Sequence, residues 1–143
     1  THSGLADGLN VFAGYSTISQ IASLDDRKTY AMGATYAVGG VTLGYQYSKD
    51  NTPGVAATTV DYYENHAYAI SFAVNDDLSI SYGVHESDQV TDGNDTEMDG
   101  ESLQLSYTVG GASVKFAETS VDNQKYATGT NREGRTIALT LAF

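Results

Sequence analysis

The stretch Arg135-Thr-Ile-Ala-Leu-Thr-Leu-Ala-Phe143 alternates without a break between large apolar residues and small or weakly polar ones. Side chains on an extended strand point to opposite faces in turn, so every second residue shares a face. The large apolar positions are Ile137, Leu139, Leu141 and Phe143. The positions between them are Thr136, Ala138, Thr140 and Ala142. The stretch therefore predicts a β-strand with one apolar face and one small, weakly polar face.

The same period of two recurs along the chain, whereas helical periodicity is absent, which predicts an all-β protein. The 143 residues are enough for one domain, residues 1–143. We expect eight strands, at about 9–20, 28–38, 41–50, 64–74, 78–88, 101–109, 112–121 and 135–143. Each is close to the roughly 9–11 residues with which a tilted strand crosses a bilayer.

The expected connections alternate between two kinds. Tight turns are predicted at Gly39-Gly40, Gly110-Gly111 and Ala6-Asp7-Gly8, because glycine accepts the positive φ that hairpin turns require, and a three-residue turn is predicted at Asn75-Asp76-Asp77. Longer polar connections are expected at about 21–27, 51–63, 89–100 and 122–134. In an up-and-down meander, tight turns then lie along one edge of the sheet and long loops along the other.

The turns fix which residues share a face, because the residues that flank a two-residue turn are paired. One face is apolar and carries aromatic rings near the tight-turn edge. These rings are Tyr36, Tyr45, Phe72, Tyr82, Tyr107, Phe116 and Phe143. The other face is small and polar, and its candidate functional residues are Thr42, Gln46, Ser71, Ser79, Ser81, His85, Gln104, Ser106, Lys115 and Thr136. In the first strand, Phe12 falls on the polar face and fits this pattern less well.

Two arrangements fit such a sheet. In a soluble β-sandwich or barrel the apolar face is inside, but the strand centres then present hydroxyls, glycines and alanines to water where lysine and glutamate are usual. In a transmembrane barrel the apolar face meets lipid and the small polar face lines the interior. Aromatic rows on either side of an aliphatic band are typical of membrane interfaces. We therefore favour an antiparallel up-and-down transmembrane β-barrel.

The apolar last strand ending in Phe143, the tight-turn edge and the acidic long loops together resemble the C-terminal half of a general porin of Gram-negative, alphaproteobacterial type. The resemblance implies an outer-membrane location, a sixteen-stranded barrel, a homotrimer, and contact with lipid and lipopolysaccharide. It also implies that the barrel assembly machinery reads the last strand, with Leu139, Leu141 and Phe143 as its signal. Leu141 departs from the second aromatic residue usual in the family.

The number of strands leaves two barrels possible. A closed eight-stranded barrel has an interior just wide enough to be filled by side chains, and filling it takes long residues. The inward positions here are mostly small, with Lys115 almost alone as a long ion. We therefore expect half of a wider, sixteen-stranded barrel that lets small hydrophilic solutes diffuse through a water-filled channel. The alternatives are a complete eight-stranded barrel with a structural or adhesive role through its acidic loops, and a soluble ligand-binding β-sandwich.

The charges exclude some functions and favour others. The 18 acids against 7 bases give a net charge of -11, which opposes nucleic-acid binding and favours a mild cation preference at a channel mouth. The densest acidic run offers a weak candidate loop for Ca²⁺ or Mg²⁺, at Asp92, Asp95, Glu97 and Asp99. A solvated loop is the simpler interpretation, so no cofactor is expected. Without cysteine, a nucleophile motif or a histidine pair at ligand spacing, we do not expect an enzyme.

Overall fold

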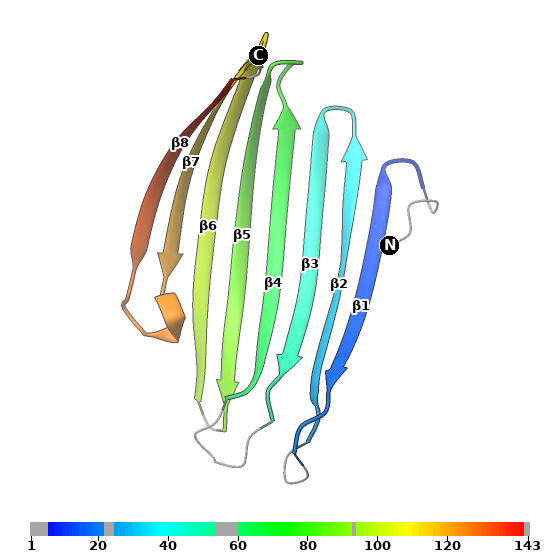
Figure 1. Cartoon of the computed structure of the whole chain (residues 1–143), viewed down its shortest axis with the longest axis vertical. Coiled ribbons are helices and arrows are strands. Elements are labelled where there is room, and N and C mark those ends of the chain that lie inside the picture. Colours follow the sequence, from blue (N-terminus) through cyan, green and yellow to red (C-terminus); the bar gives the residue numbers. More distant parts are fainter. Residues whose placement is uncertain (1–5, 22–24, 54–59, 93, 142–143) are drawn as a thin grey trace.

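The computed structural model of the chain describes residues 6–21, 25–53, 60–92 and 94–141. Within them, eight strands form one antiparallel sheet in which neighbours in sequence are neighbours in space (Figure 1). The strands are β1 (Leu9–Ile18), β2 (Arg27–Val38), β3 (Val41–Asn51), β4 (Val60–Ala73), β5 (Leu78–Thr91), β6 (Asn94–Val109), β7 (Ala112–Asp122) and β8 (Arg132–Leu141). A short 3-10 helix, η1 (Gln124–Tyr126), precedes β8. The predicted all-β antiparallel meander is confirmed.

The tight turns lie along one edge of the sheet, as predicted (Figure 1). Gly39 and Gly110 each have a φ of 57°, so both two-glycine turns use the left-handed region that residues with a β-carbon avoid. In the turn between β4 and β5, the Asn75 side-chain oxygen accepts hydrogen bonds from the backbone N–H groups of Asp77 and Leu78, at 2.9 and 2.8 Å. That side chain closes the one tight turn among these that lacks glycine.

At the opposite edge one prediction is wrong. Residues 89–100 are not a long loop, because β5 continues to Thr91 and β6 begins at Asn94. The acids between Asp95 and Glu101 occupy every second position, which is the strand period, with Thr96, Met98 and Gly100 between them. This alternation was visible in the sequence, but neither face of it is apolar. Hydrophobicity therefore gave no sign that the hairpin continues beyond the apolar part of the sheet.

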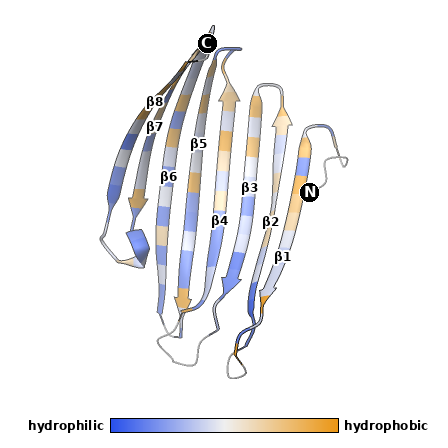
Figure 2. Cartoon of the chain, in the orientation of Figure 1, coloured by the Kyte–Doolittle hydropathy of each residue, from blue (hydrophilic) through white to orange (hydrophobic). Residues whose placement is uncertain are grey.

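The sheet has an apolar face and a polar face, and no second layer formed by the described residues covers the apolar one. Across β3 to β8, one row of directly paired residues on that face consists of Val41, Phe72, Ile80, Leu105, Phe116 and Ile137. Among the described residues no hydrophobic side chain is fully buried. Orange bands gather toward the tight-turn edge in Figure 2, whereas η1 and the opposite ends of β2, β3 and β6 are blue. The described residues thus form a single sheet and not the two layers of a sandwich.

The sheet is open. Among the described residues β1 pairs with β2 alone and β8 pairs with β7 alone, so both outer strands keep a free edge. A complete eight-stranded barrel would need β1 to pair with β8, and that pairing is not present in the described residues. The meander is therefore established, whereas closure into a barrel stays a prediction. The described part of the chain holds no helix long and apolar enough to cross a membrane.

The misfit of Phe12 has a local explanation. Phe12 pairs with Gly33, and Gly33 pairs with Gln46, which places the Phe12 ring on the polar face. A β-carbon added to Gly33 would lie 2.6 Å from the Phe12 ring and 2.6 Å from the Tyr45 carbonyl oxygen. The aromatic ring therefore covers a site where only glycine leaves room for it.

Candidate functional site

The predicted functional residues of the polar face lie in continuous rows across the sheet. In the first row, Thr42 pairs with Ser71, Ser71 with Ser81, Ser81 with Gln104, Gln104 with Ala117 and Ala117 with Thr136. A second row joins Ser79, Ser106 and Lys115, and a third joins Gln46, Ala67 and His85. Because directly opposite residues share a face, all ten predicted residues stand on the polar face.

Part of this face is hollowed. A cavity of about 470 Å³ lies over β5 to β8 and is open to solvent. Six of the predicted residues line it, namely Ser79, Ser81, Gln104, Ser106, Lys115 and Thr136. Thr42, Gln46, Ser71 and His85 lie elsewhere on the same face. The described residues give Lys115 no ion-pair partner within 4 Å, so its ammonium group is available to solvent or solute.

The predicted aromatic rows stand on the opposite face. Tyr36, Tyr45, Phe72, Tyr82 and Tyr107 are each about two fifths exposed or more, and Phe116 is partly exposed. Leu139 and Leu141 of the proposed assembly signal are exposed on the same face, at 63% and 52%. Phe143, the last member of both predicted sets, lies outside the described residues. Within the described residues, the large apolar groups on this face therefore contact only their neighbours on the sheet and are not covered by a second layer.

A second group of rings marks where the apolar face ends. His66 lies between two tyrosines, with ring centroids 5.1 Å from Tyr47 and 6.2 Å from Tyr45. The Tyr45 hydroxyl lies 3.0 Å from Nδ1 of His66, and Tyr45 also packs against Tyr68 at 5.3 Å. Beyond these rings, Lys49 pairs with Glu64 at 3.4 Å and lies over the Tyr62 ring. The rings therefore separate an apolar zone from a charged one on the same face.

The acids of β4 to β7 are sorted onto this face as well. At the level of these rings or beyond it lie the acids that have the same parity as the apolar row, which are Glu64, Glu86, Asp88, Asp95, Glu97, Asp99, Glu101 and Asp122. Glu118 shares this parity but stands nearer the tight turns, opposite Leu103 and Arg135, and it pairs with Arg135 at 2.7 Å. Some acids stand directly opposite one another on neighbouring strands. Asp88 is opposite Glu97, and Glu86 is opposite Asp99. Outside the irregularity at Val60–Tyr62, the eight strands place few charged side chains on the polar face, namely Arg27, Asp50, Lys115 and Arg132.

This crowding changes proton affinity. Partial burial and the neighbouring carboxylates, Glu64 first among them, raise the pKa of Asp88 above its usual value. The pKa of Glu97 is also raised, chiefly by Asp99 and then by partial burial. A raised pKa in the folded protein means that the charged form is penalised by folding. The repulsion is therefore present at neutral pH and is relieved as the pH falls through these raised values.

The acidic run does not build the metal site considered from the sequence. Asp92 lies in the turn, whereas Asp95, Glu97 and Asp99 point to one side of a strand at intervals of about 7 Å, given a rise of roughly 3.3 Å per residue. Carboxylates that share one Ca²⁺ each approach it to about 2.3–2.6 Å. Among the described residues, no group of three or more histidine or acidic side chains is close enough to hold a metal ion.

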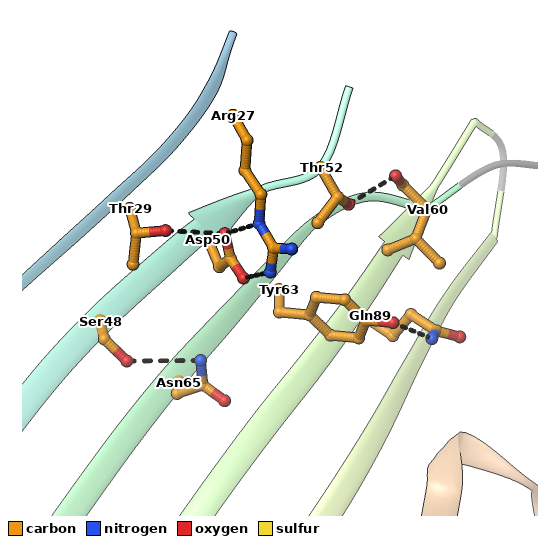
Figure 3. A network of polar contacts seen from close by, with 9 residues as sticks. All are labelled: Arg27, Thr29, Ser48, Asp50, Thr52, Val60, Tyr63, Asn65 and Gln89. Carbon is orange, nitrogen blue, oxygen red and sulfur yellow. Dashed lines mark hydrogen bonds and ion pairs between the residues drawn. The ribbon is translucent and has the colours of Figure 1, made fainter. Parts of the chain in front are cut away.

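Near the long-connection edge, the polar face carries an ion pair that the sequence did not predict. The Arg27 guanidinium donates two hydrogen bonds to the Asp50 carboxylate, with Nε 2.9 Å from Oδ1, and Thr29 donates a third at 2.9 Å (Figure 3). These bonds lower the pKa of Asp50. Their contribution to stability is therefore present above the ordinary aspartate pKa and is lost as the pH falls through the lowered value.

A hydrogen-bonded chain runs beside this pair on the same face. Ser87 donates to Asn65 at 2.6 Å, and Asn65 donates to Ser48 at 3.4 Å. The Ser87 hydroxyl also lies 2.7 Å from the hydroxyl of Tyr126, which belongs to η1. Since Ser87 gives its proton to Asn65, Tyr126 donates to Ser87. No periodic signal in residues 122–134 pointed to this contact, because it joins residues 39 positions apart in sequence.

The chain matches no family model and no curated protein sequence. The polar face offers a hollowed wall of hydroxyl and amide groups with few charges. The apolar face offers exposed rings and aliphatic groups, bordered by acids.

Proposed function

We propose that this chain forms part of the wall of an outer-membrane diffusion channel, a porin, with its apolar face toward lipid and its polar face toward a water-filled lumen. The observation that carries the proposal is the contiguous row of exposed apolar residues on a one-layer sheet in which no described hydrophobic side chain is buried. Monomeric soluble proteins rarely expose patches of this kind. Lipid covers such a face without a second protein layer, and the backbone of a sheet is satisfied by its own ladder.

The two groups of rings support the same placement. Tyr36, Phe72 and Tyr107 stand near the tight-turn edge, and Tyr47 and Tyr68 stand where charged residues begin. Aromatic rings are favoured at both membrane interfaces. In outer-membrane barrels the short turns face the periplasm and the longer connections face the exterior. We accordingly place the acids beyond the rings outside the bilayer, beside the charged headgroups of lipopolysaccharide.

The free edges of β1 and β8 indicate how many strands the barrel needs, and the number of strands sets the width of the channel. In the part of the chain that the structure describes, each edge presents unpaired N–H and C=O groups that a lipid environment does not satisfy. The proposal therefore includes further strands that pair with both edges, as in the sixteen-stranded barrel of a homotrimeric porin. Small side chains across the polar face leave room for water and solute, since a lumen lined by serine, threonine and alanine is not filled.

The first test of the proposal is conductance. The purified protein, folded in detergent and added to a planar bilayer, is expected to insert and to give discrete current steps. Insertion without current would favour a closed barrel with a structural or adhesive role. A protein that stays folded and soluble without detergent would contradict the proposal and favour a soluble ligand-binding domain.

The second test is ion selectivity. We propose a mild cation preference that originates in acids at the long-connection edge, such as Asp25, Asp26 and Asp92. Lys115 on the polar face, which has no ion-pair partner among the described residues, opposes this preference. Lys115→Gln is therefore expected to raise the cation-to-anion permeability ratio by about twofold at low salt, where screening is weak.

The measurement is the reversal potential in a salt gradient. Lys49→Gln is the matched control, because it removes the same charge from the opposite face of the sheet. A wild-type channel that prefers chloride would contradict the proposed cation preference. Equal shifts from both lysines would contradict the assignment of Lys115 to the lumen.

A further inference from the structure

The connection between β7 and β8 folds back over the polar face. Tyr126 reaches the Ser87 hydroxyl at 2.7 Å, and its ring packs against Tyr63 with centroids 5.4 Å apart. Ser87 pairs with Asn65 and Tyr63 pairs with Gln89 in the β4–β5 ladder, at positions that belong to the polar face. Ser87 is 1% exposed and is the only fully buried residue of the described chain. The connection therefore covers the wall at this point.

The covering segment, residues 123–131, is tied together internally and to the sheet. Asn123 is central, because its side-chain oxygen accepts from the Gly129 N–H at 2.9 Å and its side-chain nitrogen donates to the Glu97 carbonyl oxygen at 3.1 Å. The Gln124 N–H donates to the Thr130 carbonyl oxygen at 2.7 Å, which closes the segment on itself. We call residues 123–131 the inward loop.

The backbone of the inward loop is held in an unusual conformation. Asn123, Lys125 and Tyr126 have φ values of 50°, 60° and 57°, in the left-handed region that residues with a β-carbon rarely adopt. Such conformations persist where surrounding contacts hold them in place. Here the Tyr126 contacts with Ser87 and Tyr63, together with the Asn123 bonds, supply that restraint. The loop is thus fixed in a defined place over the polar face.

We propose that the inward loop projects into the channel lumen and narrows it at the long-connection end, with the exposed Lys125 presented to passing solutes. This inference rests on the proposed function, because a lumen exists only if the polar face lines a channel. It adds a specificity determinant that the wall residues do not supply. Solutes that enter would meet the loop near the Arg27–Asp50 pair and the Tyr63–Gln89 pair before they reach the open hollow over β5 to β8.

The position of Lys125 can be tested with thiol reagents, because the protein has no cysteine of its own. In Lys125→Cys channels, reaction with a bulky thiol reagent is expected to lower single-channel conductance by about twofold or more. Reagents of similar size and opposite charge are expected to shift the reversal potential in opposite directions. The matched control is Glu97→Cys, an exposed position in β6 beside the inward loop but on the opposite face of the sheet.

The docking of the loop can be tested without any current. In the folded protein, the thiol of Ser87→Cys is expected to react with an alkylating reagent at least tenfold more slowly than that of Glu97→Cys. Adding Tyr126→Ala, which removes the covering ring, is expected to restore most of the reactivity. Rapid alkylation of Ser87→Cys with Tyr126 in place would overturn the proposed docking.

The outcomes separate the two proposals. A folded, inserted wild-type protein that gives no current steps would contradict the channel itself, while the alkylation result would still decide whether the loop covers the wall. Current steps in the wild type that are unchanged after Lys125→Cys is labelled would overturn the inward loop as a constriction and leave the channel proposal standing.

Discussion

Replacing Ile70 by lysine is expected to prevent stable insertion into a lipid bilayer. Ile70 lies in the middle of the apolar face, 45% exposed, between Leu43 and Tyr82 on the neighbouring strands. On the lipid face of a transmembrane barrel, lysine near the midplane costs about 2–4 kcal/mol. That is roughly a 30- to 1,000-fold loss in the folding equilibrium, since about 1.4 kcal/mol corresponds to tenfold.

The control is the adjacent residue. Ser71 stands on the polar face between Thr42 and Ser81, so Ser71→Lys is expected to fold and insert like the wild type and to reduce conductance instead. Folding into lipid vesicles, followed by protection from protease and by urea titration, measures both variants. If Ile70→Lys folds as well as Ser71→Lys, the apolar face does not meet lipid and the porin proposal fails.

Replacing Gly33 by alanine is expected to destabilise the N-terminal part of the sheet by about 1–3 kcal/mol, the usual cost of forcing atoms into a filled space. The added carbon would lie 2.6 Å from the Tyr45 carbonyl oxygen and 2.6 Å from the Phe12 ring, and the backbone oxygen can retreat only if β3 shifts. The midpoint of urea unfolding should fall without a change in the slope of the transition.

Gly14→Ala is the matched control for this prediction. Gly14 lies in β1 on the same face, and a β-carbon there would meet no atom within 4 Å. Because glycine weakens a strand interior by about 0.5–1 kcal/mol relative to alanine, this variant should be neutral or slightly more stable. Combining Gly33→Ala with Phe12→Leu should recover only the part of the loss that comes from the ring. Full recovery would show that the Tyr45 carbonyl imposes no constraint.

The strands that the sequence predicted well are those whose alternation includes apolar residues. An apolar side chain alternates with a small one at every step in such strands, and this contrast predicts which face each residue occupies. Examples are Arg135–Phe143, Leu78–Tyr82 and Val41–Tyr45. The register then follows from the glycine turns, which is why the ten predicted residues of the polar face fall in continuous rows. Where the contrast disappears, as in Asp95–Glu101, hydrophobicity predicts a loop although the structure has a strand.

The candidate site was predictable only in part, for a related reason. Parity along a strand places Ser81, Gln104 and Lys115 on one face, because that placement is local and repeats every two residues. The contact between Tyr126 and Ser87 depends instead on how an irregular segment turns in space. The bond between Arg27 and Asp50 needs both the register of β2 with β3 and the length of two side chains.

By itself, the sequence determined the strand period, the position of the tight turns and the division of the strands into an apolar and a polar face, because each is a local consequence of side-chain alternation or glycine conformation. Only the tertiary structure decided that the acids of β5 and β6 share the side of the apolar face and that residues 123–131 cover the polar one. The first feature depends on the acidic alternation continuing as paired strands, which the contrast between apolar and polar residues does not indicate. The second depends on a loop held by hydrogen bonds between residues distant in sequence.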